Sequence, residues 1–346
     1  MDQPATLRRR RKMQRVTMTE VAHAAGVSPS TVSLYLRKPA LVSPEIGARI
    51  AAVVDELGYV PSLVAGGLAA AGSRVVSIIV PSVRNAFFAD TVSALQEELG
   101  ASGLQLMLGH TDYSAAQEEA LVRTALSWSP AAIVLVGMEH TRAARGLLLT
   151  TAVPVFEIWE CGQSPTDTAV GFHNREVGIA AALHLIERGR TRLAFFGARM
   201  QEDRRAHQRA AGFARAVTDR GVDAPLMLDR PGVAATETGV ALLDEALAAD
   251  PRLDAIACSN DIVALGVLFE CQRRGIAVPD QLAVIGFGDL NFSASCVPPL
   301  TTIKPPGEAI GRKVGQLIGS RLQGSPRPAS PQVFDLGFSL IVRQST

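Results

Sequence analysis

The sequence of 346 residues has few features that would form disulfides, metal sites or membrane spans. Its four cysteines are far apart, and no two have the spacing of a zinc site or a redox pair, so reduced thiols in a cytoplasmic protein are expected. These cysteines are Cys161, Cys258, Cys271 and Cys296. None of the six histidines stands in an HExxH motif or a paired metal-ligand spacing. The apolar runs, such as 131–136, have the length of a strand and are far too short to cross a bilayer, so we expect no bound metal and no membrane segment.

The sequence also lacks the loops with which common enzymes hold phosphates and nucleophiles. No GxGxxG fingerprint follows a strand, and neither a Walker A loop nor a GxSxG elbow occurs. The basic N-terminus is not followed by an apolar run, so it does not have the pattern of a secretory signal. These absences argue against an enzyme with catalytic residues or a cofactor, and against a secreted sugar-binding protein, although fold class alone excludes neither.

Charge is distributed unevenly along the chain. The formal net charge is only +1, but residues 1–60 hold nine Lys or Arg against five Asp or Glu, a net charge of +4 that leaves −3 for the rest. A basic N-terminus on a near-neutral body indicates a local site for a polyanion. The apolar fraction of 47% permits two or three domains with large cores, and residues 1–15 are expected to form a basic arm.

The segment after this arm shows the start and stop signals of short helices. Thr17 is a candidate helix cap, and Glu20 three residues later completes the spacing of a capping box. Gly26 stands where a glycine ends a helix, and Ser28 caps the next helix with Pro29 at its first position. Two short helices joined by a tight turn are therefore predicted.

A third helix is expected from Ser43 to about Leu57, which completes a helical domain over 16–60. The composition then changes, because residues 61–73 are small and uncharged and include two adjacent glycines. Such a segment is too short and too rich in glycine for a stable isolated helix. It is therefore predicted to be a hinge linker.

Residues 74–346 alternate apolar strand-like runs with amphipathic helical stretches, in two successive series. In the second series, a strand over 192–197 precedes a helix over 208–220. Continuous apolar strands separated by helices predict parallel sheets that are covered on both faces. Two series predict two doubly wound lobes with a cleft between them, which is a usual place for a ligand.

The turn between the first two helices carries a specific pattern. Ala22 is a small residue facing the second helix, Gly26 forms the turn, and Val21, Val32 and Leu36 supply the small core that holds the helices together. This is the pattern of a helix-turn-helix, whose second helix presents its N-terminal polar residues to the major groove of DNA.

The same segment resembles the LacI family of bacterial regulators. Its matching positions are Val21-Ala22, Ala25-Gly26-Val27-Ser28, Thr31-Val32-Ser33, Val42-Ser43, Leu57-Gly58-Tyr59, Pro61, Ala65 and Leu68. Those in the body are Ser259-Asn260-Asp261, Ala264-Leu265-Gly266, Val278-Pro279-Asp280, Ile285-Gly286-Phe287 and Leu300-Thr301-Thr302-Ile303. The resemblance covers nearly the whole chain. It implies a small all-α helix-turn-helix domain followed by a two-lobed α/β domain for effector binding and dimerisation over 74–346, similar to periplasmic binding proteins.

Within this family the chain resembles the gluconate-operon repressor branch. The strings that carry this likeness are Leu126-Ser127-Trp128, Ala169-Val170-Gly171-Phe172, Phe196-Gly197-Ala198-Arg199, Phe269-Glu270-Cys271-Gln272-Arg273 and Asp335-Leu336-Gly337-Phe338. The likeness implies gluconate or a related sugar acid as the small molecule that is sensed.

The family resemblance also places Pro29, Ser30 and Leu34 at the base-reading positions of the second helix. Ser30 can hydrogen-bond a base or a phosphate, whereas Leu34 offers only an apolar contact, for instance to a thymine methyl. The family commonly has Arg at the position of Leu34, so a different base preference is expected; the alternative is that Leu34 belongs to the core. The expected phosphate contacts, which position the domain without reading sequence, are Thr17, Ser28, Thr31, Ser33, Arg37 and Ser43.

Leu68 matches the family's hinge leucine, which enters the minor groove at the operator centre and kinks the duplex. Gly66 and Gly67 stand where the family has larger polar or basic residues. A hinge that folds only on DNA is therefore expected, and such a hinge is a natural point of control.

For the small molecule, the resemblance indicates the cleft between the lobes. Phe87 and Phe88 match ligand-contact positions, with an ordinary core pair as the alternative. Arg209 matches the family's ligand-clamping arginine, because Ala211-Gly212-Phe213 fixes the register, and a guanidinium suits a carboxylate or a pair of sugar hydroxyls. The other expected effector-binding residues are His173, Arg205, Asn260 and Asp289.

The acidic positions of this cleft depart from the family. Where the family often has Asp directly after a Gly-aromatic pair, Gly288 stands here and Asp289 follows. The shift or loss of an acidic ligand group favours an anionic effector over a neutral sugar. Asp261, beside Asn260, is interpreted either as a ligand contact or as the N-cap of the next helix.

Together these features predict a homodimer that binds a pseudo-palindromic double-stranded DNA operator and releases it when a sugar acid binds. Paired half-sites are expected because a single helix-turn-helix buries too little surface for useful specificity. Corepression, or activation by another carbohydrate, stays open as an alternative. The sequence shows no heptad tail after Phe338, which favours a dimer over a tetramer.

Overall fold

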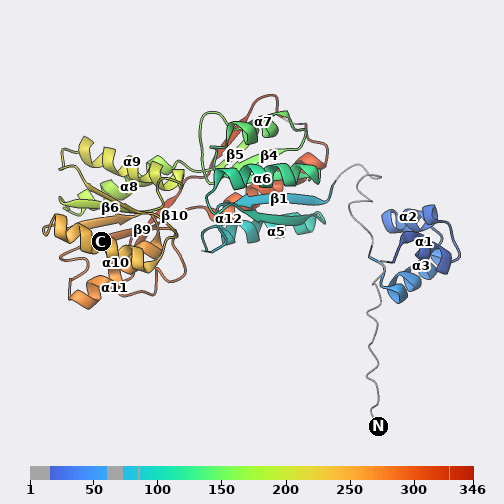
Figure 1. The fold of residues 1–346 in the computed structure, drawn as a ribbon, viewed down its shortest axis with the longest axis horizontal. Coiled ribbons are helices and arrows are strands. Elements are labelled where there is room, and N and C mark those ends of the chain that lie inside the picture. Colours follow the sequence, from blue (N-terminus) through green and yellow to red (C-terminus); the bar gives the residue numbers. More distant parts are fainter. Residues whose placement is uncertain (1–15, 61–72, 85, 327) are drawn as a thin grey trace, which may run out of the picture. The chain divides into compact units, whose positions relative to one another are not determined.

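The computed structural model describes residues 16–60, 73–84, 86–326 and 328–346 (Figure 1). The chain divides into two compact units, Met1–Ser73 and Arg74–Thr346. The predicted basic arm, the predicted linker up to residue 72 and Leu68 lie outside the described residues. Among those described, no helix is long and apolar enough to cross a membrane.

The N-terminal unit is built from short helices. Its elements are α1 (Met18–Ala24), α2 (Pro29–Arg37), the 3-10 turn η1 (Pro39–Leu41) and α3 (Pro44–Leu57). The predicted caps are confirmed, because Thr17 and Glu20 form a capping box and the Ser28 side chain accepts from the Thr31 amide. Gly58 ends α3 at a φ of 62°, a conformation that favours glycine. The helices enclose a core of Val21, Ala22, Ala25, Val32, Ile50 and Tyr59.

One lobe of the C-terminal unit surrounds a parallel sheet of order β11-β5-β4-β3-β1-β2. Its strands are β1 (Val75–Val80), β2 (Gln105–His110), β3 (Ala132–Val136), β4 (Val155–Ile158), β5 (Thr168–Gly171) and β11 (Gln332–Asp335). Its helical elements are η2 (Ala86–Phe88), α5 (Ala89–Ala101), α6 (Ala115–Ser127), α7 (Arg142–Thr150) and α12 (Gly307–Leu322). Alternate residues of β1 enter different cores: Val76 and Ile78 pack with Leu95 of α5, whereas Ile79 packs with Val122 of α6. Helices therefore cover both faces of this sheet.

The other lobe surrounds a sheet of order β12-β10-β9-β8-β6-β7. Its strands are β6 (Leu193–Ala198), β7 (Leu226–Arg230), β8 (Ala255–Cys258), β9 (Ala283–Phe287), β10 (Thr301–Lys304) and β12 (Ser339–Ile341). Its helices are α8 (Asn174–Glu187), α9 (Arg204–Asp219), α10 (Thr236–Ala249) and α11 (Asp261–Arg274). The strand pairs are parallel except that β12 runs antiparallel to β10. The prediction of two doubly wound lobes is confirmed, with this one antiparallel edge added.

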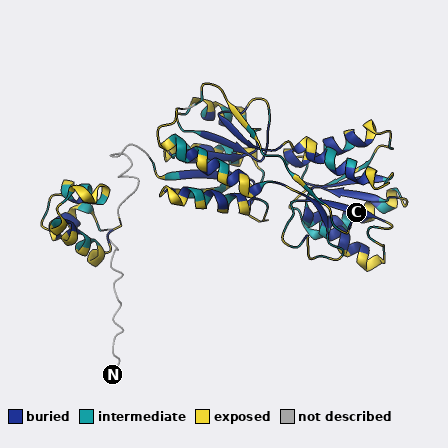
Figure 2. Cartoon of the chain, turned by 180° about the vertical axis from the view of Figure 1, so that it is seen from behind, coloured by how far each residue is buried: buried dark blue, intermediate teal, exposed yellow. Residues whose placement is uncertain are grey.

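Burial follows the layers of both lobes (Figure 2). The central strands are buried and the outer sides of the helices are exposed, as expected where helices cover both faces of a sheet (Figure 2). The edge strands β2, β7, β11 and β12 have no buried residue. In the described part of the chain, the polypeptide passes between the lobes after β5, after β10 and after β11. The two lobes are thus joined by several chain segments, and one apolar core contains residues of both lobes, such as Phe156 and Phe195.

Helix α9 begins earlier than the predicted range of 208–220. Asp203 is its N-cap, and its carboxylate accepts hydrogen bonds from the amides of Arg205 and Ala206. Arg205 and Arg209 therefore lie four residues apart, on the same face of one helix.

Helices α8 and α9 approach each other closely because glycines stand at their contact. A Cβ on Gly178 of α8 would lie 1.8 Å from the carbonyl oxygen of Arg209, and a Cβ on Gly212 of α9 would lie 2.1 Å from that of Arg175. Either contact is far shorter than packing allows, so both positions require glycine. This packing sets the position of α9 and of the arginines that it carries.

Candidate functional site

The exposed side of α2 is the candidate surface for reading DNA. Pro29 and Ser30 are exposed at its N-terminus, and Val32 is buried in the small core. Leu34 is half-buried, and in the described N-terminal helices it is not among the residues that pack against that core. This placement favours an outward-facing Leu34 over the alternative of a core residue.

The other expected DNA contacts have local structural roles in the free protein. Ser28 hydrogen-bonds the hydroxyls of Ser30 and Thr31 at 2.7 and 2.8 Å, and the Arg37 side chain donates to the carbonyl of Ser33 at 3.1 Å. Thr17 bonds Glu20 as a cap, and hydrogen bonds to Thr17 lower the pKa of that glutamate. Ser43 is the first residue before α3 and makes no side-chain cap bond. These hydroxyls lie at helix N-termini, where phosphate oxygens are readily bound.

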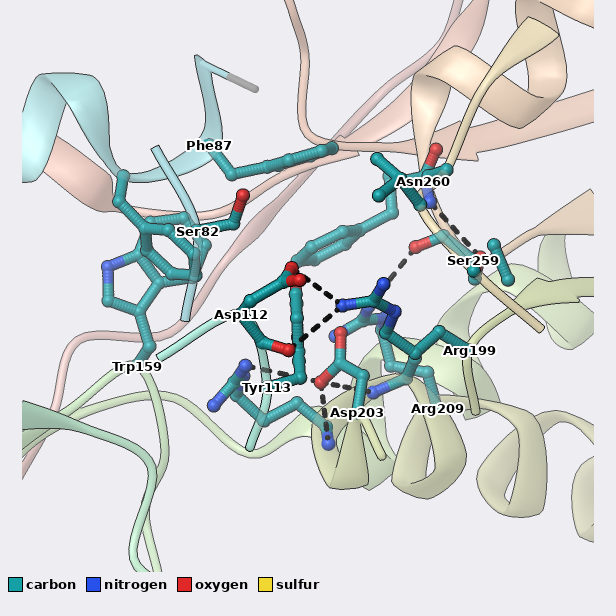
Figure 3. Close-up of a pocket in the computed structure, with 18 residues that line it drawn as sticks. Ser82, Phe87, Asp112, Tyr113, Trp159, Arg199, Asp203, Arg209, Ser259 and Asn260 are labelled. Carbon is teal, nitrogen blue, oxygen red and sulfur yellow. Dashed lines mark hydrogen bonds and ion pairs between the residues drawn. The ribbon is translucent and has the colours of Figure 1, made fainter. Parts of the chain in front are cut away.

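The C-terminal unit contains a pocket with residues of both lobes in its lining (Figure 3). The space between its lining atoms is about 640 Å³, part of which is open solvent. Aromatic rings form one side: Phe87 stacks with Phe287 at 6.4 Å between centroids, and Phe88 meets Trp159 edge-on at 4.9 Å. Such rings can cover the C–H faces of a sugar-like ligand.

Charged residues form the opposite side of the pocket, and two of its arginines have carboxylate partners. Arg205 forms an ion pair with Asp203 at 3.2 Å, and Arg199 forms one with Asp112 at 3.0 Å. Burial disfavours the charge of Arg205, but Asp203 and other neighbours leave its pKa raised. Each of these two positive charges is therefore matched by a negative charge nearby.

Arg209 is different because its partners are neutral. It donates to the side-chain oxygen of Asn174 at 2.7 Å and to the carbonyl of Ser259 at 3.1 Å, and its guanidinium lies 4.0 Å from the centroid of the Phe287 ring. The residue is 7% exposed, and its Nε has no hydrogen-bond partner in the described structure. A buried cation with no direct ion-pair partner is stabilised by an anion that approaches it, so Arg209 is a candidate anion-binding group.

The titration of the pocket follows from this burial. Burial lowers the pKa of Arg209 to about 10, with Asp203 opposing and Arg205 reinforcing the shift. Burial raises the pKa of Tyr113 to about 12, and the negative charge of Asp203 adds to it. At neutral pH the pocket therefore presents a charged Arg209 beside a protonated tyrosine hydroxyl.

Several residues of the lining have a left-handed backbone. The φ angles of Asp112, Tyr113, Trp159 and Arg199 are 48°, 64°, 66° and 60°. Non-glycine residues adopt this conformation at a cost of about 1–3 kcal/mol and do so preferentially at functional sites. The strain supports the assignment of this pocket as the ligand site of the C-terminal unit.

The structure brings together five of the expected effector-binding residues. Those in the pocket lining are Phe87, Phe88, Arg205, Arg209 and Asn260. Two others are outside this lining: His173 is half-exposed and lies 3.6 Å from Asp335, and Asp289 pairs with Arg343 at 2.6 Å and with Lys304 at 3.4 Å. The carboxylates of Asp335 and Asp289 thus have partners within the protein.

Asp261 is not the N-cap of α11, so that interpretation was wrong. The cap is Asn260, whose side-chain oxygen accepts from the amide of Val263 at 3.0 Å. Asp261 is buried, and it accepts from the hydroxyls of Thr302 and Ser293. It therefore holds the loop after β9 and the start of β10 rather than a ligand.

Sequence reasoning missed part of the pocket. The lining residues that it did not single out include Ser82, Asp112, Tyr113, Trp159, Arg199 and Asp203. Only Asp203 had a detectable signal, since an Asp directly before an arginine-rich helix is a candidate cap. Within the described ranges, no group of His, Cys, Asp and Glu side chains could hold a metal ion.

Comparisons with known proteins agree with this architecture. The family model "Bacterial regulatory proteins, lacI family" matches residues 17–62, and the "Periplasmic binding protein-like domain" matches residues 182–346. The chain is 38% identical, over 96% of both chains, to the HTH-type transcriptional regulator GntR of Pseudomonas aeruginosa. It is 32% identical to GntR of Escherichia coli K12, covering 95% of this chain and 98% of that protein.

A solved structure supports the same conclusion. The crystal structure of a LacI-family transcriptional regulator from Silicibacter pomeroyi matches with a TM-score of 0.90 and 32% identity, over 95% of this chain and 99% of that one. The fold and the pocket thus define a two-lobed sensor joined to a helix-turn-helix. The chain belongs to the LacI family and is a DNA-binding transcriptional regulator, as its relatives are, and not an enzyme. Regulators of this family bind operator DNA and small-molecule effectors, typically as dimers.

Proposed function

We propose that this regulator is a repressor whose effector is gluconate or a closely related sugar acid. The observation that carries the proposal is Arg209, a buried guanidinium of the pocket lining whose hydrogen-bond partners are neutral. A carboxylate beside this guanidinium would supply a negative charge and accept a hydrogen bond from it. A neutral sugar would supply only the hydrogen bond.

The rest of the pocket suits the polyol part of such a ligand. Asn260 and Ser82 offer polar groups to hydroxyls, whereas Phe87 and Trp159 offer apolar faces to the carbon chain. Arg205 lies 6.0 Å from the centroid of the Phe88 ring, so these two residues join the aromatic side of the lining to the charged side. The similarity to GntR proteins and to the gluconate-operon branch supports the same ligand class.

On the DNA side, we propose that two chains form a homodimer in the cytoplasm and bind a pseudo-palindromic operator. Pro29, Ser30 and Leu34 read bases in the major groove. Leu68, in the linker over 61–73, enters the minor groove between the half-sites. The phosphate contacts are Thr17, Ser28, Thr31, Ser33, Arg37 and Ser43.

Ligand and DNA are coupled because both lobes contribute to one pocket. A molecule that contacts Phe88 in one lobe and Arg209 in the other favours one relative arrangement of the lobes. If that arrangement fits the operator less well, binding of the ligand releases the DNA. In this mechanism the regulator represses transcription until the sugar acid binds and releases it from the operator.

The test is operator binding by fluorescence anisotropy, with DNA from upstream of the protein's own gene cluster. Tight, salt-sensitive binding that gluconate weakens and glucose does not is the expected result. The variant Arg209→Gln keeps the DNA affinity and loses the response to gluconate. Specific DNA binding that responds to neutral sugars instead of gluconate would overturn the effector assignment, and the absence of specific DNA binding would overturn the operator assignment.

A further inference from the structure

The pocket holds a set of charges that almost cancel. Its charged lining consists of Asp112, Arg199, Asp203, Arg205 and Arg209, three positive and two negative side chains. The ion pairs described above use both carboxylates, so one positive charge is left over. A ligand with a single negative charge restores the balance, whereas a second negative charge has no free cation to meet.

The pair of Asp112 and Arg199 closes the side of the pocket next to Tyr113. The Arg199 guanidinium donates to the carboxylate of Asp112 at 3.0 Å and to its carbonyl at 3.1 Å, and it lies 5.1 Å from the centroid of the Tyr113 ring (Figure 3). Asp112 follows β2 in one lobe and Arg199 follows β6 in the other. The side chain of Arg199 is only 15% exposed, so its guanidinium is held within the wall of the pocket.

The two carboxylates of the pocket, those of Asp203 and Asp112, have different structural roles. Asp203 caps α9 and accepts from two backbone amides, so it is needed for the helix itself. In the described part of the chain, the Asp112 carboxylate accepts a side-chain hydrogen bond from Arg199, and 53% of the Asp112 side chain is exposed. The hydrogen bond from Arg199 lowers the pKa of Asp112, which keeps it ionised at neutral pH.

We propose that Asp112 is a specificity-determining residue that restricts the effector to monocarboxylates. With Arg209 holding the first carboxylate, a second carboxylate at the far end of the ligand meets the charge of Asp112 and finds Arg199 already paired. Like charges brought together disfavour the wrong ligand, although water at the half-exposed Asp112 screens part of the repulsion. The pocket therefore accepts an aldonate and rejects the corresponding aldarate, which has a carboxylate at each end. This inference rests on the proposed function.

The experiment compares gluconate, glucarate and glucose as probes, by calorimetry and by the fluorescence of Trp159 in the pocket. The full-length wild type, Asp112→Asn and Arg199→Gln are measured side by side. Asp219→Asn is the matched control, because Asp219 pairs with Arg215 at 3.3 Å on the exposed side of α9 and not in the pocket. Thermal melting checks that each variant is folded.

The wild type and the control variant are expected to bind gluconate at least tenfold more tightly than glucarate. Asp112→Asn frees Arg199 for a second carboxylate, so the preference for gluconate falls by about tenfold or more. Arg199→Gln removes a positive charge and leaves Asp112 unpaired, so it weakens the binding of both acids and does not improve the binding of glucarate.

The proposal predicts that Asp112→Asn improves the binding of glucarate relative to gluconate and that Arg199→Gln does not. Simple loosening of the pocket wall would give the same effect in both variants. If both variants admit glucarate, the pair acts as a steric barrier and the proposal is overturned. If Asp112→Asn keeps the wild-type preference, Asp112 does not select the ligand and the proposal is likewise overturned. If the wild type binds neither acid, the proposed effector class fails, and the present inference fails with it.

Discussion

Asn174 at the start of α8 holds Arg209 of α9 through a 2.7 Å hydrogen bond between its side-chain oxygen and Nη1 of the arginine. Its amide nitrogen donates in turn to the carbonyl of Trp159 at 3.0 Å, in the other lobe. Asn174 is 1% exposed, and it does not line the pocket itself. It therefore connects the proposed carboxylate-binding group with a wall residue of the opposite lobe.

Asn174→Ala removes this connection and leaves Arg209 with a single hydrogen-bonded partner. A hydrogen bond to a charged group is worth about 1.5–3 kcal/mol, so the affinity for gluconate is expected to fall by roughly ten- to a hundredfold. Calorimetric titration measures the affinity. Glu176→Ala, at an exposed position of the same helix, serves as the control and leaves the affinity unchanged. An unchanged affinity in Asn174→Ala would show that Arg209 needs no positioning from α8.

Gly178→Ala tests the close packing that places α9. The added Cβ would lie 1.8 Å from the Arg209 carbonyl, so the two helices must separate. Overpacking of this kind costs about 1–3 kcal/mol, and we expect a lower melting temperature together with weaker gluconate binding. Gly146→Ala in α7 is the matched control, because its Cβ would meet nothing within 4 Å and a helical alanine is at least as stable as glycine. Equal melting temperatures for the two variants would contradict the packing argument.

Local signals in the sequence were sufficient for the N-terminal unit. The capping box of Thr17 and Glu20, the cap at Ser28 and the stop at Gly58 each depend on residues within one turn of helix. The alternation of strands and helices also predicted both lobes, because burial on two faces makes parallel strands continuously apolar. These features need no knowledge of distant contacts.

The pocket could be predicted only in part, for two physical reasons. Asp112 and Arg199 stand 87 positions apart and meet across the lobes, so no local pattern connects them. Their left-handed backbones are also unexpected for residues other than glycine. The start of α9 was placed too late because the stretch before Arg209 is charged and shows no apolar periodicity, and its helix depends on the cap at Asp203.

Leu34→Arg is expected to change which bases the regulator prefers. The leucine is half-buried on α2 and does not pack against the small core, and it can contact only apolar groups such as a thymine methyl, whereas arginine forms two hydrogen bonds with guanine. One such pair discriminates by about 1–3 kcal/mol, so selection from randomised half-sites should enrich guanine at one position. Val32→Ala, in the buried core, should lower stability and leave the preferred sequence unchanged. The same preferred bases in Leu34→Arg and wild type would exclude Leu34 from the base-reading surface.

His140 lies between two carboxylates and gives the C-terminal unit a pH-dependent stability. Its ring nitrogens lie 2.6 Å from Glu118 and 3.1 Å from Glu157, which is fully buried and also accepts from Thr166. Burial alone would lower the pKa of His140, but the hydrogen bonds and charges of the two glutamates raise it to about 9. The imidazolium is therefore present throughout the neutral range and compensates the buried charge of Glu157.

Because the folded pKa of His140 lies above its unfolded value of 6.5, the stabilisation is complete below pH 6.5 and is lost as the pH rises through 9. The loss is on the order of 3 kcal/mol. Urea unfolding between pH 6 and 10 should show this decline in the wild type and in His110→Gln, whose histidine is exposed. His140→Gln should be less stable at pH 6, because Glu157 stays buried without its counter-charge, and its stability should depend less on pH. A parallel decline in His140→Gln and wild type would assign the titration to another group.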